Sequence, residues 1–366
     1  MSAGSPGPAA GAAAGAGPAP RRAYVTDCEG PLTKNDNAQE IAAHFIPGGA
    51  ELFARLSRYD DFLADVLRRP GYNAGDTLRL LPPFLKAFEV TDEGVEAFSA
   101  EGVLMVPGAL EALHGIAALL PAFIISTSYT PYLKALCRLS GFPPANVRCT
   151  ELSLDAWAMP EEEKAWLRDE AARVLERGLI EIPEGARAPG DLAPADAVTV
   201  ARLDDLFWTQ MTGRVSGALV AAVRPVGGGM KLAALLEIVA AQGVAGAGVM
   251  YVGDSITDAP PLAAVKAWGG ISLSFNGNGY ALAAAELAAA GPSAEVAAEL
   301  AKAFASGGRD GVMVVVRAWP TPTSGEKPTG RARARVGLVA EEPEALAEAS
   351  AAARRSVRGV RIARLG

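Results

Sequence analysis

Short apolar runs alternate along the chain with longer segments of helical pattern. Residues 23–27, AYVTD, form a run of this kind that ends in Asp27 and is soon followed by Gly-Pro. That pattern is typical of a buried strand that enters a tight turn. Five further runs of similar character predict strands; they cover residues 121–127, 147–154, 248–254, 269–275 and 311–319.

The segments between these runs carry apolar residues at helical spacing. Residues 36–102 predict several helices, separated at the Pro/Gly breaks 47–49 and 70–71. Residues 155–212 are charged, helical in pattern and poor in strand signals. Further helices are predicted at YLKALCRLSGF, KLAALLEIVAAQG and PEALAEASAAARRSV, with an Ala-rich helix after the NGNG segment.

Strands that alternate with helices predict an α/β protein with a Rossmann-like, doubly wound parallel sheet. Ligands of such sheets bind at the carboxyl ends of the strands, and three of the predicted strands carry Asp27, Ser126 and Asp254 at that end. The chain is divided into a disordered leader (1–20), a core (21–35, 103–154 and 213–290), a helical region (36–102), a helical insertion (155–212) and a C-terminal extension (291–366) with a mobile loop near 320–335 and a terminal helix.

Composition narrows the classes of function. The net charge of -7 and the pI near 5.2 argue against nucleic-acid binding, which usually needs a basic face. Three cysteines without a CxxC pair make a disulfide framework or a zinc site a poor explanation, and a reducing compartment fits them best. With only His44 and His114, a Ser-His-Asp triad or a histidine-rich metal site has little to draw on.

The first twenty residues are an Ala/Gly/Pro tract. They lack the basic start and the Leu/Val-rich stretch of a signal peptide, and no apolar run reaches membrane-spanning length without interruption. We therefore expect a cytoplasmic protein that has neither a membrane nor a nucleic acid as its partner.

Two carboxylates stand directly after the first predicted strand. Asp27 would be aimed along the strand axis into the site, and Glu29 lies on the turn. A carboxylate can attack phosphorus to form an aspartyl-phosphate, which divides one difficult displacement into two easier ones. A neighbouring acid can protonate the leaving oxygen and later deprotonate the hydrolytic water, a role that contributes about 10²–10⁴-fold.

The VGDSITD segment adds Asp254 and Asp258, one helical turn apart at the start of a helix. Mg²⁺ prefers oxygen ligands of this kind and bridges to substrate phosphate, so the segment predicts a magnesium site. Lys231, after three glycines, would neutralise the phosphoryl group, and Ser126 would hydrogen-bond one of its oxygens. Together these groups predict a phosphoryl-transfer site.

In chain order, DCEGPLT, IISTS, Lys231 and VGDSITDAPPL resemble the four motifs of the haloacid dehalogenase (HAD) superfamily: DxDx[TV], a strand-end Ser or Thr, a Lys, and GDxxxD. The resemblance covers roughly 21–33, 105–150 and 214–280. It implies a HAD core with a helical cap domain: residues 36–102 match the place of the C1-type cap of phosphoserine phosphatase-like members, and 155–212 would enlarge that cap. With its DCEGPLTKNDNA opening and SFNGN segment, the whole chain further resembles HAD proteins known as energy-converting hydrogenase subunit R.

The same resemblance implies a role for each residue. Asp27 is the nucleophile, Asp254 ligates Mg²⁺, and the metal also takes the backbone carbonyl of Glu29. The implied residues are Asp27 and Glu29 as catalytic groups, Ser126, Thr127 and Lys231 as phosphate-binding groups, and Asp27, Glu29, Asp254 and Asp258 at the metal. The implied activity is hydrolysis of a small phosphorylated metabolite; membership of an oligomer or a larger complex is left open.

Other functions stay open. Position 29 is Glu where most phosphatases of the superfamily carry Asp, and its longer arm places the acid differently. An accessory or regulatory HAD-fold protein with little turnover is one alternative, and a phosphonatase or phosphotransferase is another. A dehalogenase is disfavoured because it has no use for the paired acids Asp254 and Asp258.

Several residues also have plainer interpretations. Ser126 competes with Thr127 and Ser128, each of which can instead cap the following helix. Lys231 can be a solvated helix lysine, and Asp258 a helix N-terminal charge. A solvated helix face is the preferred interpretation of four further basic residues: Arg55, Arg58, Arg68 and Arg69.

Overall fold

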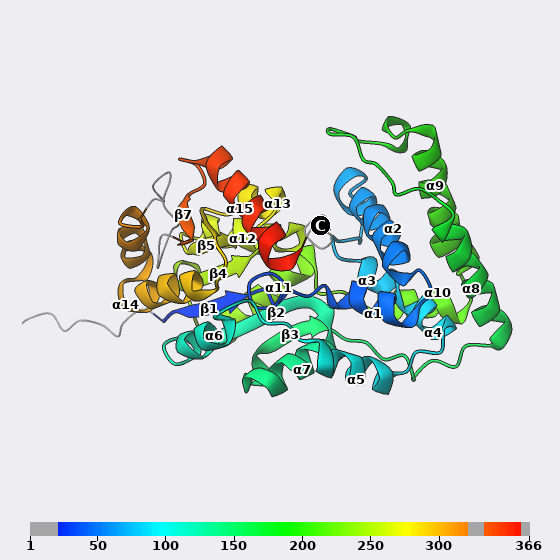
Figure 1. Ribbon diagram of the computed structural model, residues 1–366, viewed down its shortest axis with the longest axis horizontal. Helices are drawn as coiled ribbons and strands as arrows, with labels where there is room; N and C mark the ends of the chain where they lie inside the picture. The colour runs from blue at the N-terminus through cyan, green and yellow to red at the C-terminus, as the bar shows by residue number, and fades with distance from the viewer. Residues whose placement is uncertain (1–20, 321–332, 360–366) are drawn as a thin grey trace, which may run out of the picture.

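The computed structural model describes residues 21–320 and 333–359 (Figure 1). A sheet of seven strands has the order β3-β2-β1-β4-β5-β6-β7; the first six strands are parallel and β7 is antiparallel to β6. This confirms the predicted α/β class with a doubly wound parallel sheet. The strands are β1 (Ala23–Thr26), β2 (Ala122–Tyr129), β3 (Val147–Thr150), β4 (Val249–Gly253), β5 (Ile271–Phe275), β6 (Leu287–Ala290) and β7 (Arg335–Leu338).

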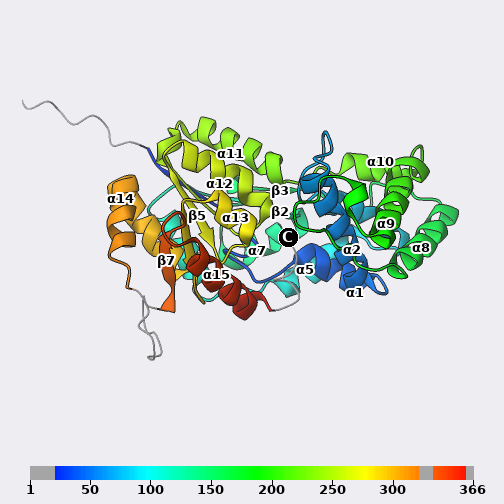
Figure 2. The same cartoon turned by 90° about the horizontal axis from the view of Figure 1, so that it is seen from above.

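Both faces of the sheet are covered, because successive side chains of a strand point to opposite sides. Tyr24 of β1 lies in the apolar cluster shared with α6, α7 and α14, whereas Val25 lies in the cluster shared with α11 and α12. Figure 2 shows α11 and α12 together on one side of the sheet. The helices of the core are α6 (Ala109–Ala117), α7 (Thr130–Ser140), α11 (Gly228–Gln242), α12 (Ala259–Ala267), α13 (Gly279–Ala284), α14 (Glu295–Arg317) and α15 (Pro343–Arg358).

Two stretches far apart in sequence form a second body, here called the helical lobe and defined as residues 37–102 and 154–222. They share one apolar cluster, in which Leu56 and Phe84 of the first stretch meet Leu167 and Phe207 of the second. In Figures 1 and 2 the lobe lies at one end of the sheet. Its helices are α1 (Asn37–Phe45), α2 (Gly49–Asp61), α3 (Thr77–Leu80), α4 (Pro82–Ala87), α5 (Asp92–Gly102), α8 (Glu161–Leu175), α9 (Pro194–Asp205) and α10 (Val215–Ala222).

Hydrogen bonds from α2 also join the two stretches of the lobe. Arg55 Nε donates to the carbonyl of Arg177 at 2.7 Å, and Arg58 Nε donates to that of Ile180 at 3.2 Å. These two arginines therefore hold the lobe together rather than forming a purely solvated face.

The strand predicted at 311–319 is wrong. Residues 311–317 are the last part of α14, in which Val312 and Val316 are buried and Val314 is exposed. Burial at a spacing of four residues is helical, and the run of valines gave it the appearance of a strand. The Ala-rich helix predicted after NGNG is only the short α13, and residues 287–290 of the same Ala-rich stretch form β6.

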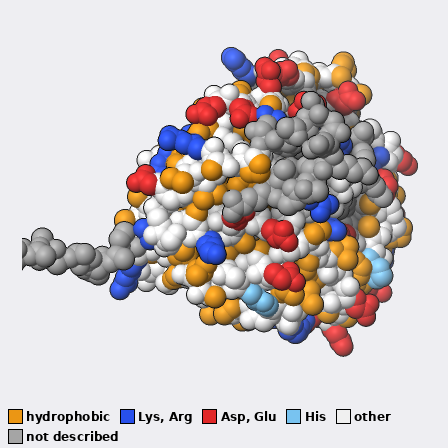
Figure 3. Space-filling model, turned by 60° about the vertical axis from the view of Figure 1, so that its left-hand side comes forward, with side chains coloured by type: hydrophobic (Ala, Val, Ile, Leu, Met, Phe, Trp, Pro, Cys, Tyr) orange, Lys and Arg blue, Asp and Glu red, His pale blue; other side chains and the backbone are white. Residues whose placement is uncertain are grey.

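The C-terminal helix is confirmed as α15. The predicted leader, and residues 321–332 of the predicted loop near 320–335, lie outside the described residues. Within 21–320 and 333–359, no helix combines the length and the apolar character needed to cross a bilayer. Basic and acidic side chains are interspersed among apolar ones on the coloured part of the face in Figure 3.

Candidate active site

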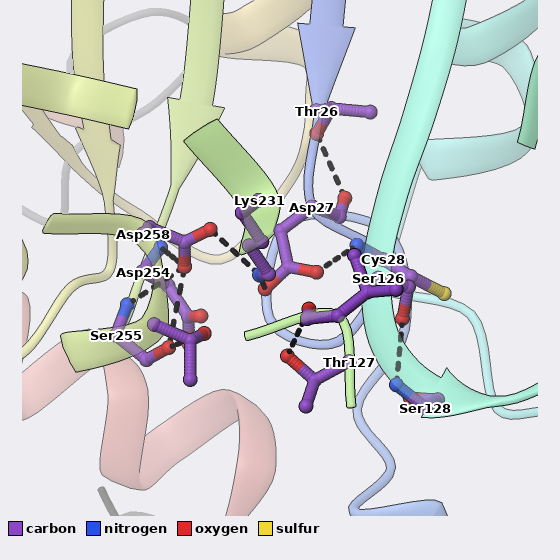
Figure 4. Close-up of polar contacts among 12 residues, drawn as sticks. Thr26, Asp27, Cys28, Ser126, Thr127, Ser128, Lys231, Asp254, Ser255 and Asp258 are labelled. Atoms are coloured by element: carbon purple, nitrogen blue, oxygen red, sulfur yellow. Dashed lines mark hydrogen bonds and ion pairs between the residues drawn. The ribbon is translucent and has the colours of Figure 1, made fainter. Parts of the chain in front are cut away.

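The three strand ends singled out in the sequence converge at one edge of the sheet. β1 pairs with β2 on one side and with β4 on the other, so Asp27, Ser126 and Asp254 come from three neighbouring strands. Asp27 is held in place by its backbone, whose N–H donates to the carbonyl of Val252 at 2.9 Å. Figure 4 shows these side chains together with Lys231 of α11.

Lys231 is fully buried and joins two carboxylates. Its Nζ lies 2.7 Å from Asp27 Oδ2 and 2.7 Å from Asp258 Oδ1. Burial alone would lower the pKa of Lys231, but the two carboxylates outweigh it and hold the pKa above its usual range. The lysine is therefore a buried cation of the site, which excludes the interpretation as a solvated helix residue.

Asp258 is saturated with hydrogen bonds from the protein. Its Oδ1 accepts from Lys231 and, at 2.8 Å, from the hydroxyl of Tyr251. Its Oδ2 accepts from the backbone N–H groups of Asp254 and Ser255, each at 3.1 Å. Although burial opposes ionisation, Lys231 and these donors lower the pKa of Asp258. Its arrangement is that of a fixed anion that positions the lysine and the turn after β4.

The turn that follows Asp27 packs directly against Asp254. Gly30 has a φ of +107°, and a Cβ at this position would stand 2.3 Å from Asp254 Cγ. A side chain there is excluded by both the backbone conformation and the contact. Glycine thus allows the loop after β1 and the carboxylate after β4 to meet.

The carboxylates meet the requirements of a divalent cation. One oxygen from each of Asp27, Asp254 and Asp258 can lie within 4.8 Å of the others, and all three residues are buried. An all-oxygen donor set of this kind suits Mg²⁺. Burial, followed by repulsion from Asp258, raises the pKa of Asp27 to about 8, and Lys231 acts in the opposite direction.

The hydroxyl groups at the end of β2 differ in their bonding. Thr127 Oγ1 donates to the carbonyl of Val226 at 3.1 Å, whereas Ser126 Oγ accepts from the N–H of Ser128 at 3.2 Å. Both Ser126 and Thr127 line the cavity described below. The hydroxyl proton of Thr127 is thus used to hold the loop before α11.

Glu29 reaches toward the helical lobe. Its Oε1 accepts from the backbone N–H of Asn37, the first residue of α1, at 2.8 Å. Burial, followed by repulsion from Asp36, raises the pKa of Glu29 to about 8, while Arg358 acts in the opposite direction. The side chain lines the same cavity as Asp27, but it lies outside the carboxylate cluster that could hold a metal.

The cavity at this edge has a volume of about 120 Å³. The sheet forms one wall, and the lobe contributes an apolar and acidic wall that includes Phe53, Asp60 and Leu78. A larger groove of about 750 Å³ lies elsewhere along the lobe and contains none of the strand-end residues. His44 of α1 is exposed and stacks on Phe98.

Two residues of the site were missed in the sequence. Arg354 and Arg358 of α15 line the cavity, and the Nη1 atoms of both donate to Asp254 Oδ2, at 2.5 and 3.0 Å respectively. The signal in the sequence is their spacing of four, which places both on one helix face. That spacing carries no information about which surface the face meets.

Comparison with solved structures finds one that is similar over nearly the whole chain. No protein-family model matches the sequence, and none of the curated proteins matches it. The gene product AF1437 of Archaeoglobus fulgidus aligns with 94% of this chain and 99% of its own, at 28% identity and a TM-score of 0.80. A phosphoserine phosphatase with a phospho-aspartyl intermediate analogue aligns with 73% of this chain and 91% of its own, at 12% identity and a TM-score of 0.44.

Proposed function

We propose that this protein is a HAD-type, Mg²⁺-dependent phosphatase that hydrolyses a small phosphate monoester through an aspartyl-phosphate on Asp27. The observation that supports it most is the buried ion pair of Lys231 with Asp27 at the edge of a parallel sheet, 2.7 Å from Nζ to Oδ2. A carboxylate that attacks an anionic phosphate needs its repulsion cancelled, and a lysine fixed at this distance supplies part of that charge. The order of the four motifs along the chain supports the same assignment.

The metal would be held by Asp27 and Asp254. Each oxygen of Asp258 already accepts hydrogen bonds from at least two protein donors, so this residue is assigned to positioning Lys231 instead. When bound, Mg²⁺ would neutralise charge on the phosphoryl group and orient it. Of the set expected from the sequence, Asp258 is thus left out of the metal ligands, and the backbone carbonyl of Glu29 stays in it.

In the first half-reaction, a carboxylate oxygen of Asp27 forms a bond to phosphorus and the ester P–O bond breaks. Lys231 and the Ser126 hydroxyl hold the phosphoryl oxygens. Glu29 gives its proton to the leaving oxygen; burial raises the pKa of Glu29 and so favours the protonated form that this step needs. Water then attacks phosphorus, Glu29 takes a proton from it, and inorganic phosphate and free Asp27 are released.

The helical lobe would act as the cap of this site. Its residues form the wall of the cavity opposite the strand ends, where the leaving group of a substrate would lie. A cavity of about 120 Å³ suits a small metabolite, provided that the lobe moves apart to admit it.

A second candidate function is an accessory protein with little turnover. Two observations favour it: Glu29 is bound to the N-terminus of α1, and two arginines occupy Asp254, the residue assigned to the metal. Both contacts would have to change during a catalytic cycle. A phosphonatase or a phosphotransferase would use the same nucleophile and differ in what is cleaved or accepts the phosphoryl group.

A phosphate-release screen separates these functions. The full-length protein is incubated with a panel of phosphorylated metabolites, with Mg²⁺ or with a chelator, as wild type and as Asp27→Asn. The exposed Asp169 of α8, changed to Asn, is the matched control. We expect Mg²⁺-dependent release by wild type and by the control, and none by Asp27→Asn. Absence of release from every compound would favour the accessory role, and release by Asp27→Asn would contradict the assigned nucleophile.

A further inference from the structure

The C-terminal helix places two arginines in the candidate active site from about a hundred residues downstream of Asp254. Leu346, Ser350, Arg354 and Arg358 follow one another at intervals of four, and the first three are buried. Leu346 packs on Leu282 of α13 and Ala288 of β6, and this contact anchors α15 to the sheet. The side chains of Arg354 and Arg358 are only 5% and 7% exposed.

Both guanidinium groups converge on one carboxylate. Arg354 Nη1 donates to Asp254 Oδ2 at 2.5 Å and to the carbonyl of Asp254 at 3.1 Å. Arg358 Nη1 donates to the same Oδ2 at 3.0 Å, and its Nη2 donates to the carbonyl of Asn35 at 2.6 Å. Two cations thus share one oxygen of the carboxylate that the proposed function gives to Mg²⁺.

The remainder of the cavity wall is acidic. Among the described residues that line it, the basic side chains are Arg354 and Arg358, and the acidic ones are Asp27, Glu29, Asp36, Asp60, Asp61 and Asp254. A guanidinium presents its donors in a planar fork that matches carboxylate and phosphate oxygens. The arginine pair is therefore the part of the wall suited to an anion.

We propose that Arg354 and Arg358 bind an oxyanion of the substrate, either a phosphoryl oxygen or a carboxylate on the leaving group. The proposal rests on the proposed function, because a divalent cation held by Asp254 would compete with the two guanidinium groups for this carboxylate. Like charges would then stand side by side in a buried place, which is costly unless an anion joins them. The substrate supplies that anion. When neither substrate nor metal is bound, the carboxylate of Asp254 pairs with the two arginines instead.

Binding of two probes tests this without turnover. In Asp27→Asn protein, calorimetry measures the Kd of inorganic phosphate and of phosphoglycolate, which carries both a phosphate and a carboxylate. Arg354→Gln and Arg358→Gln are each expected to weaken phosphoglycolate about tenfold or more, the usual effect of a lost hydrogen bond to a charged group. Arg355→Gln, on the exposed face of the same helix, is expected to leave both Kd values within about twofold. Weaker phosphate as well assigns the pair to the phosphoryl group, and weaker phosphoglycolate alone assigns it to the carboxylate.

A second readout separates ligand binding from a merely structural role. With Asp27 intact, Arg358→Gln removes a cation that competes for Asp254, so it is expected to bind Mg²⁺ more tightly than wild type while it binds the oxyanion less tightly. A structural role would weaken both and lower Tm. That result, or oxyanion affinity unchanged in both arginine variants, would overturn the proposal. Because the oxyanion assay needs no hydrolysis, an inactive wild type whose arginine variants lose oxyanion binding would refute the phosphatase function and leave this site standing.

Discussion

The cavity is bounded by two walls that are built in different ways. At the sheet edge, Asp27 and Asp254 directly follow buried strands, and a backbone hydrogen bond from Asp27 to Val252 fixes one strand end against the next. The facing wall, here called the helix wall, is made of helix side chains such as Arg354 of α15 and Asp60 of α2, which tertiary packing brings to the cavity. Parallel-sheet topology therefore positions the carboxylates Asp27 and Asp254, whereas the helix wall depends on how helices pack. Four substitutions test this contrast.

The largest effect is expected at Lys231 of α11, which is buried behind the sheet-edge wall and contacts Asp27 there. Lys231→Met leaves Asp27 and Asp258 as buried carboxylates without their cation, so the free energy of unfolding should fall by about 3–5 kcal/mol. Denaturant unfolding measures the change. Lys302→Met, at an exposed position of α14, is the control and should shift it by less than about 0.5 kcal/mol. An equal loss of stability in both variants would show that the buried ion pairs of Lys231 do not stabilise the sheet edge.

Glu29 stands between the two walls. Glu29→Gln removes the proposed proton donor, and kcat should fall about 10²–10⁴-fold with the fold intact. Steady-state kinetics measure this on a substrate found in the screen, with Glu101→Gln, at an exposed position of α5, as the control. A kcat within about twofold of wild type would contradict the acid–base assignment.

Gly30 tests whether the sheet-edge wall needs its close contact. Gly30→Ala imposes a strained φ of +107° and pushes a Cβ into the Asp254 carboxylate, so stability should fall by about 1–3 kcal/mol and Mg²⁺ should bind less tightly. In contrast, Gly115→Ala lies in α6 with nothing within 4 Å of the new Cβ, and it should stabilise the protein by about 0.5–1 kcal/mol. Unchanged Mg²⁺ affinity in Gly30→Ala would show that the contact is dispensable.

The effect at Asp60, on the helix wall, is expected to be smallest at low pH and to grow as the pH rises. Burial, followed by repulsion from Asp61, raises its pKa from 3.8 to about 8. Between these two pH values the unfolded chain releases a proton that the folded chain keeps, so this residue costs stability increasingly as pH rises. Asp60→Asn should therefore match wild type near pH 4 and become increasingly more stable than wild type as the pH rises toward 8.

Denaturant unfolding of wild type and Asp60→Asn across this pH range measures the difference. Asp169→Asn, exposed on α8, should not reproduce the trend. A pH-independent difference for Asp60→Asn would mean that the carboxyl group is ionised throughout and that the helix wall is more open than its burial indicates.

The sequence predicted the sheet-edge wall because its residues are local to recognisable strand ends. Asp27, Ser126 and Asp254 each close an apolar run, and parallel strands necessarily bring such ends to one edge. Lys231 was found by its place in the motif order, but its burial between two carboxylates was not visible in its polar, glycine-rich surroundings. The segment around Val314 shows a local signal that misled. Its β-branched residues predicted a strand, but the segment is the end of α14, in which Val312 and Val316 are buried and Val314 is exposed.

The helix wall could not be predicted for a physical reason. Periodicity identifies which residues of a helix share a face, as with Arg354 and Arg358, but not what that face packs against. The lobe shows the same limit: residues 36–102 and 155–212 were predicted as two helical regions, and only the family resemblance implied that the second enlarges the first. Their common apolar core arises from tertiary contacts. The raised pKa of Asp60 shows this limit too, because its largest cause is burial, and the burial of Asp60 does not follow from its own helix.

The central claim is that Asp27 carries the phosphoryl group, and peptide mass spectrometry after an acid quench tests it most directly. Wild type is mixed with Mg²⁺ and an active substrate, quenched within the first turnover, digested, and compared with Asp27→Asn. The account predicts one added phosphoryl group on the peptide that contains Asp27, and none in the variant. Phosphoryl transfer to another residue, or rapid hydrolysis by wild type with no phosphorylated peptide at any quench time, would contradict it.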